Sequence, residues 1–124
     1  MGAAVTLVVP NPVAGNVDQQ VSATNPLITT EPKATTGAVT NVSDSATSVT
    51  LIAANSSRKA LVITNTSSAI LYVRLAAGTA SATMFTYRLP QNATQEITMP
   101  YTGIVTGVWA TDPNDGVAVV TELT

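Results

Sequence analysis

The chain has 124 residues, the usual size of one domain, and its apolar fraction of 45% excludes a wholly disordered protein. Only 10% of its residues are charged, against roughly 25% in a typical soluble domain, and its formal net charge is -2. The 5 Lys and Arg residues are too few for a nucleic-acid surface or for binding to an anionic membrane, so neither partner is expected.

The sequence contains no cysteine and no histidine. A disulfide framework, a thiolate nucleophile and a Cys-based zinc site are therefore excluded. No stretch approaches the roughly 20 apolar residues that a transmembrane helix requires. Residues 3–9 are apolar, but no basic region precedes them. A signal peptide is therefore not expected, and we expect the chain to be made in the cytoplasm and left unprocessed.

Residues 1–46 are predicted to form an extended N-terminal arm. This segment holds four prolines and no aromatic residue. Residues 5–9 favour a strand, which Pro10 and Pro12 would end. Residues 14–44 show neither strand nor helix periodicity. Alone, they cannot bury enough apolar area to offset an ordering entropy of about 1–2 kcal/mol per residue. The alternative is a disordered tail, which the low charge disfavours.

Residues 47–124 are predicted to form a β-sandwich domain. Turn-forming residues recur at intervals of roughly 8–12 residues, which is typical of a sandwich or barrel. The strongest turn signal is Asp-Pro-Asn-Asp-Gly at 112–116. We expect an all-β, antiparallel, jelly-roll-like sandwich of about seven strands. The runs that favour strands are 49–53, 60–63, 70–75, 83–89, 95–99, 103–110 and 116–123.

Two of these runs predict a hairpin. Residues 60–63 and 70–75 are separated by a short polar link that begins with Asn65-Thr66-Ser67-Ser68, a series of turn formers. Strict alternation in the second run divides its side chains between two faces. One face carries Ile70, Tyr72 and Arg74, and the other carries Leu71, Val73 and Leu75.

Candidate catalytic groups are few. Without histidine, a nucleophile would depend on a lysine or carboxylate base, and neither Ser-x-x-Lys nor Gly-x-Ser-x-Gly occurs. Glu96 and Glu122 lie near strand ends and could flank a cleft, as glycosidase chemistry requires. The favoured interpretation is that both are solvent-facing charges, so no catalytic residue is assigned.

Two further signals have a functional and a structural interpretation. The 112–116 segment partly matches a calcium loop, but the full ligand pattern is missing, so neither a metal nor another cofactor is expected. Trp109 is the only tryptophan and could stack on a sugar, with Tyr72, Tyr87 and Tyr101 extending the patch. The favoured interpretation places Trp109 in the core or at a subunit interface.

Four segments, taken in order, resemble small β-sandwich virion proteins of tailed bacteriophages. The first two are Arg-Lys-Ala-Leu-Val-Ile-Thr-Asn at 58–65 and Leu-Tyr-Val-Arg-Leu at 71–75. The third runs from Glu96 through Pro-Tyr-Thr-Gly at 100–103 to Gly-Val-Trp at 107–109, and the fourth is Ala-Val-Val-Thr-Glu-Leu at 118–123. The resemblance covers about residues 48–123 and not the first 46. It implies no catalytic residues.

The resemblance implies a protein of the virion, made in a bacterial host. We expect a capsid decoration or cement protein that binds the assembled head through the major capsid protein or other virion proteins. Low charge independently favours burial against other subunits, in a homodimer or homotrimer. Alternatives are a neck, tail or head-fibre component, a carbohydrate-binding receptor module and, least favoured, a Glu-dependent hydrolase. Expected assembly contacts are Val5, Leu7, Val8, Val9, Tyr101 and Trp109.

Overall fold

The computed structural model describes residues 33–124, which contain eight strands and no helix. The all-β prediction is therefore confirmed for this part of the chain. The predicted strand at 5–9, and the rest of the arm up to residue 32, lie outside the described residues. The strands are β2 (Gly37–Ser43), β3 (Val49–Ile52), β4 (Ala60–Asn65), β5 (Leu71–Arg74), β6 (Tyr87–Leu89), β7 (Thr94–Ile97), β8 (Val105–Trp109) and β9 (Val117–Leu123).

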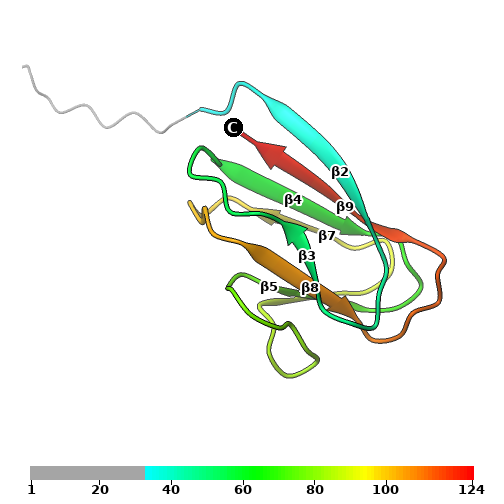
Figure 1. Cartoon of the computed structure of the whole chain (residues 1–124). Helices are drawn as coiled ribbons and strands as arrows, with labels where there is room; N and C mark the ends of the chain where they lie inside the picture. Colours follow the sequence, from blue (N-terminus) through cyan, green and yellow to red (C-terminus); the bar gives the residue numbers. More distant parts are fainter. Residues whose placement is uncertain (1–32) are drawn as a thin grey trace, which may run out of the picture. The chain divides into compact units, whose positions relative to one another are not determined.

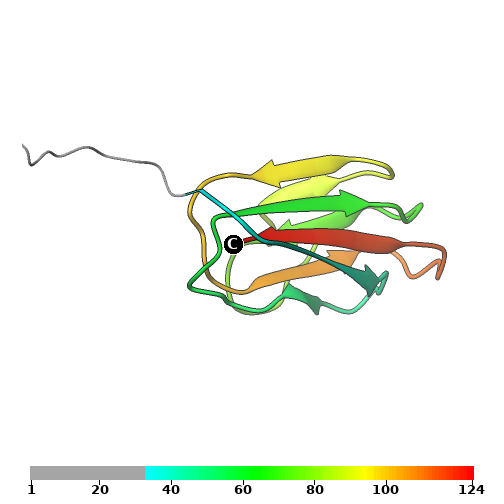
Figure 2. The ribbon, with the colours of Figure 1, turned by 90° about the horizontal axis from the view of Figure 1, so that it is seen from above.

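The strands form two antiparallel sheets of four strands each, which lie face to face (Figure 1). One sheet has the order β2-β9-β4-β7, and the other has the order β3-β8-β5-β6. Viewed from above, the strands of both sheets run along the same long direction (Figure 2). The arrangement is that of a β-sandwich with aligned layers.

The first described strand pairs with the last, and each following strand pairs with the one before the last partner in the sequence. β2 pairs with β9, β3 with β8, β4 with β7, and β5 with β6. Two further pairs, β4 with β9 and β5 with β8, connect these ribbons within each sheet. The described chain therefore has the topology of one long antiparallel ribbon folded into two layers.

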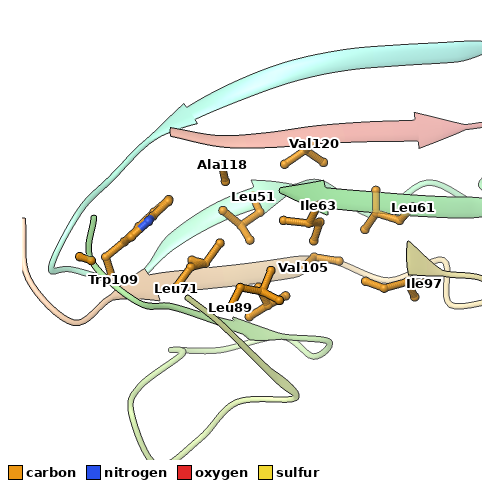
Figure 3. Packing of buried hydrophobic residues seen from close by; sticks show 12 residues of the cluster. Leu51, Leu61, Ile63, Leu71, Leu89, Ile97, Val105, Trp109, Ala118 and Val120 are labelled. Carbon is orange, nitrogen blue, oxygen red and sulfur yellow. The ribbon is translucent and has the colours of Figure 1, made fainter. Parts of the chain in front are cut away.

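The core fills the space between the sheets (Figure 3). Alternation explains which side chains reach it: on β4, Leu61 and Ile63 are at most 1% exposed, while Val62 between them is half-buried. The expected split on β5 is confirmed, because Leu71 and Val73 are fully buried. Other members of the core are Leu51, Ala69, Leu89, Ile97, Val105, Trp109, Ala118 and Val120.

The sandwich has eight strands, and the seven expected from the sequence were one too few. The additional strand, β2, lies at 37–43, inside the segment predicted to be an arm. Most of its side chains are exposed and only Val42 packs against the core. Because β2 is an edge strand with little buried surface, it has no apolar alternation that would identify it in the sequence.

The predicted hairpin of residues 60–63 and 70–75 is wrong. β4 and β5 belong to different sheets, and the link between them crosses from one layer to the other. A short polar connection between two apolar runs suits a hairpin and an inter-sheet crossing equally well, since each run needs only one buried face. The predicted strand at 83–89 is also too long, because β6 begins at Tyr87.

Candidate functional site

Trp109 is a core residue. Its side chain is 1% exposed at the end of β8, where its indole Nε1 donates a hydrogen bond of 3.0 Å to Asn65 Oδ1. The labelled indole lies between the two sheets, near Leu71 and Ala118 (Figure 3). Its face is not available to a sugar, so the stacking hypothesis for Trp109 is wrong. For the same reason, Trp109 does not provide a surface assembly contact in the described fold.

Asn65, the last residue of β4, is the polar centre of this end of the core. Its buried amide makes four hydrogen bonds: Oδ1 accepts from Trp109 Nε1 and Ser67 N, and Nδ2 donates to Ala69 O and Leu89 O. The amide therefore ties β8, the β4–β5 crossing and β6 together. A fully satisfied buried amide stabilises one arrangement of the layers, because every alternative leaves polar atoms unpaired.

The 112–116 segment closes the same end of the molecule through Asp115. Its carboxylate accepts hydrogen bonds from Ser68 Oγ (2.6 Å), Ser68 N (3.2 Å) and Ser67 Oγ (3.1 Å). The hydrogen bonds from Ser68, more than those from Ser67, hold the pKa of Asp115 below its ordinary value of 3.8. Asp44 belongs to the same network, because its Oδ2 accepts from the Ser67 hydroxyl at 2.8 Å and from Asp115 N at 3.2 Å.

These acidic side chains act as loop anchors. Within residues 33–124, no group of three or more His, Cys, Asp or Glu side chains could hold a metal ion. The position of Gly116 is fixed by the backbone of Ser67, because a Cβ on this glycine would lie 2.5 Å from Ser67 Cα. The turn chemistry recognised in the sequence thus serves to hold the β8–β9 loop against the β4–β5 crossing.

Glu122 has a different role from the one that the sequence suggested. It faces the interior opposite Leu61, and its carboxylate forms a 2.8 Å ion pair with Arg58, which is 4% exposed. The guanidinium also donates to the carbonyl oxygens of Ala53, Tyr101 and Gly103. The expectation of a solvent-facing Glu122 is therefore wrong: the pair joins β9 to the β3–β4 and β7–β8 loops at the opposite end of the core.

Glu96 does not share a site with Glu122. Glu96 is exposed on β7 and is paired in register with Val62, whereas Glu122 is paired with Leu61 on the neighbouring strand. Since successive residues of a strand point to opposite faces, the two carboxylates lie on opposite faces of one sheet. They cannot flank a common cleft, so the described geometry does not support glycosidase chemistry by this pair.

Tyr101, the other described assembly candidate, supports the loop before β8. It is half-buried, and its hydroxyl donates a 2.7 Å hydrogen bond to Ile104 O. Its ring leaves no room for a side chain at position 103, where a Cβ would lie 2.5 Å from the Tyr101 hydroxyl oxygen. The remaining candidates, Val5, Leu7, Val8 and Val9, lie outside the described residues.

A surface depression of about 440 Å³ lies beside β5 and β8. The loop at 79–82 and the loop at 46–48 form its walls, and Tyr72 and Val108 are among its lining residues. Its lining contains no charged side chain, and the nearby Ser48 hydroxyl is used to accept a hydrogen bond from Ala80 N. The lining therefore offers hydroxyl groups, but no carboxylate or amine that could act as their base.

The broadest feature that sequence reasoning missed is the outward surface of the β2-β9-β4-β7 sheet. Register places its side chains in two rows across all four strands, and we call this surface the Val/Thr face. Glu96 is its only charged residue, and the edge residue Val39 is 64% exposed. Antiparallel sheets usually carry more charge on a solvated face. The rows are Val39, Thr121, Val62 and Glu96, and Asn41, Val119, Thr64 and Thr94.

The described domain as a whole has no net charge. Residues 33–124 contain five basic and five acidic residues, and the two remaining acidic residues of the chain, Asp18 and Glu31, precede them. Of these ten charged groups, Arg58 and Glu122 neutralise each other inside the molecule. A surface so poor in charge gains little protection from self-association.

Because residues 33–124 form no helix, this part of the chain has no helical segment that could span a membrane. No protein-family model matches the chain, and neither a curated protein nor a solved structure is significantly similar to it.

Proposed function

We propose that this protein is a structural component of a phage virion, a decoration or cement protein that binds the assembled head and stabilises it. The observation that carries the proposal is the Val/Thr face, which offers apolar and hydroxyl groups across four strands with one charge, at Glu96. Such a surface suits burial against another subunit. The phage setting rests on the sequence resemblance.

A jelly roll is the finer fold that we propose. In such a fold, a ribbon of paired antiparallel strands wraps into two four-stranded sheets. The pairing of β2 with β9, β3 with β8, β4 with β7, and β5 with β6 supports this proposal. The proposal of a jelly roll therefore rests on the strand connectivity, and it does not depend on the sequence resemblance.

The proposed role requires no catalysis and no cofactor. The partners would be the major capsid protein or other virion proteins, together with further copies of this chain in a dimer or trimer. A neutral domain fits a site crowded with neighbouring subunits, because it adds no long-range repulsion as copies accumulate. A neck, tail or head-fibre component is the alternative, since the same surface would serve any of these positions.

An add-back experiment tests the proposal. Purified chain is mixed with particles that lack it, and bound copies are quantified after sedimentation. Val119→Lys places a charge in the middle of the Val/Thr face and is expected to reduce binding at least tenfold. Thr50→Lys places the same charge on an exposed position of β3, in the other sheet, and is expected to bind like the wild type. Wild-type binding by Val119→Lys would contradict the proposal.

A further inference from the structure

β2 is the one sheet edge in the described fold that has no protection against further pairing. The other three edge strands are short, with three or four residues each; β6 and β7 carry Arg88 and Glu96, and β3 is interrupted by a register shift. β2 has seven residues, Gly-Ala-Val-Thr-Asn-Val-Ser, with no charge and no proline. Proteins that keep their edges free usually place charges, prolines or bulges there.

The hydrogen-bond pattern identifies the free groups of this edge. At the two ends of the β2–β9 ladder, Asp44 N donates to Gly116 O and Thr124 N donates to Thr36 O. Pairs alternate along an antiparallel ladder, so the even-numbered residues between them bond to β9. The N–H and C=O groups of Gly37, Val39, Asn41 and Ser43 therefore point away from β9, and no other strand within residues 33–124 pairs with them.

The inner side of β2 is also uncovered. Ala38 and Thr40 face the same way as their β9 partners, Glu122 and Val120. Val120 is fully buried, whereas Ala38 and Thr40 are exposed. The second sheet therefore stops short of β2, and a strand added beside β2 could place apolar side chains over this margin.

The chain carries a segment of suitable chemistry at residues 5–9. Its sequence, Val-Thr-Leu-Val-Val, contains no charge and favours a strand. Alternation would place Val5, Leu7 and Val9 on one face and Thr6 and Val8 on the other. Val5, Leu7 and Val9 would then cover the inner margin beside Ala38 and Thr40, and Thr6 and Val8 would extend the Val/Thr face. The 23 residues between this segment and Lys33 can span up to about 75 Å, which is enough to reach another copy.

We infer that β2 accepts residues 5–9 of a second copy of this chain, which adds as a fifth strand to the β2-β9-β4-β7 sheet. The choice of a second copy over the chain's own segment rests on the proposed function, because an assembled shell holds copies side by side. The main-chain groups of the four outward residues supply affinity, and the alternating apolar side chains supply register.

Complementary variants test this inference in the full chain. Val39→Pro removes an outward N–H while leaving the β2–β9 ladder its bonds, and Val39→Ala is the matched control. Leu7→Asp disables the donor segment, and Leu7→Ile is its control. Dissociation constants come from sedimentation velocity over a concentration series. Val39→Pro and Leu7→Asp are each expected to weaken self-association at least tenfold, and both controls are expected to associate like the wild type.

Mixing the two disabled variants gives the sharpest result. Val39→Pro retains a donor and Leu7→Asp retains an acceptor, so an equimolar mixture is expected to form a one-to-one complex. Wild-type association of Leu7→Asp would instead indicate β2–β2 pairing and overturn the inference. A monomer whose amides at 37, 39, 41 and 43 resist hydrogen exchange at every concentration would overturn it as well, because its own segment would then occupy β2.

The outcomes also separate this inference from the proposed function. If the wild type attaches to particles and Leu7→Asp self-associates normally, the inference fails and the function stands. If strand exchange occurs in solution but the chain never attaches to particles, the function fails and the strand-exchange site stands.

Discussion

Buried polar side chains join strands and loops at the two ends of the sandwich. Asn65 and Trp109 join the layers at one end by a buried amide–indole hydrogen bond, and Arg58 and Glu122 join them at the other by a buried ion pair. In both cases a buried polar group has its partners in place. Removing one partner would leave the other buried and unpaired, which costs more than the interaction itself contributes.

Asn65→Ala is expected to lower the free energy of unfolding by about 3–4 kcal/mol, because it leaves several buried donors and acceptors without partners. Urea unfolding followed by the fluorescence of Trp109, the only tryptophan, measures the change. Asn41→Ala, at an exposed position on β2, is the control and is expected to change stability by no more than about 0.5 kcal/mol. Equal stability of the two variants would contradict the central role of Asn65.

Asp115 makes the stability of the 112–116 loop depend on pH. Its pKa lies below 3.8 in the folded state because of its hydrogen bonds from Ser68 and Ser67. Its contribution is therefore fully present above its ordinary pKa and is lost as the pH falls through the lowered value. Unfolding measured between pH 7 and pH 2 should show a shallower acid decline for Asp115→Asn than for the wild type. Parallel profiles would contradict this role.

At the scale of elements, the sequence predicts what packing within a strand determines and misses what pairing between strands determines. The alternation of β5 and the loop at 112–116 could be predicted, because each depends on neighbouring residues. The partners of β4 could not, since an apolar run states that one face is buried without stating against which strand. β2 was missed because its pairing with β9 uses main-chain groups and few apolar side chains.

The candidate site follows the same division. The buried ion pair of Glu122 could not be predicted, because its partner Arg58 is 64 residues away and contacts it only in the folded protein. The Val/Thr face draws residues from four strands whose order is not readable from the sequence. One signal was present: strand runs rich in Val and Thr, in a chain with only 10% charged residues.

The position of β2 predicts how two truncations will differ. Removal of residues 1–32 is expected to leave the unfolding free energy within about 0.5 kcal/mol of the full chain, because it keeps all eight described strands and the buried cluster between them. Removal of residues 1–46 also deletes β2 and Asp44, and it is expected to cost more than about 3 kcal/mol. Thermal and urea unfolding of both forms measure this. Similar stability of the two would show that β2 contributes nothing to the sheet.

At the scale of the described domain, buried polar side chains hold the loops in place and the surface carries few charges. Its polar interactions are concentrated at the two ends of the sandwich, where they fix loops, and the Val/Thr face between them is left nearly neutral. A domain without net charge is weakly protected against association with other protein molecules, and this is an advantage only where such association is its function. These properties are mutually consistent in a component of a larger assembly.

The number of copies of this chain in purified phage particles tests the proposed role most directly. Quantitative mass spectrometry against the major capsid protein provides that number. A decoration or cement protein is expected at hundreds of copies per particle. A dozen copies or fewer would contradict decoration in favour of a neck or tail position, and complete absence from the particle would contradict a virion role.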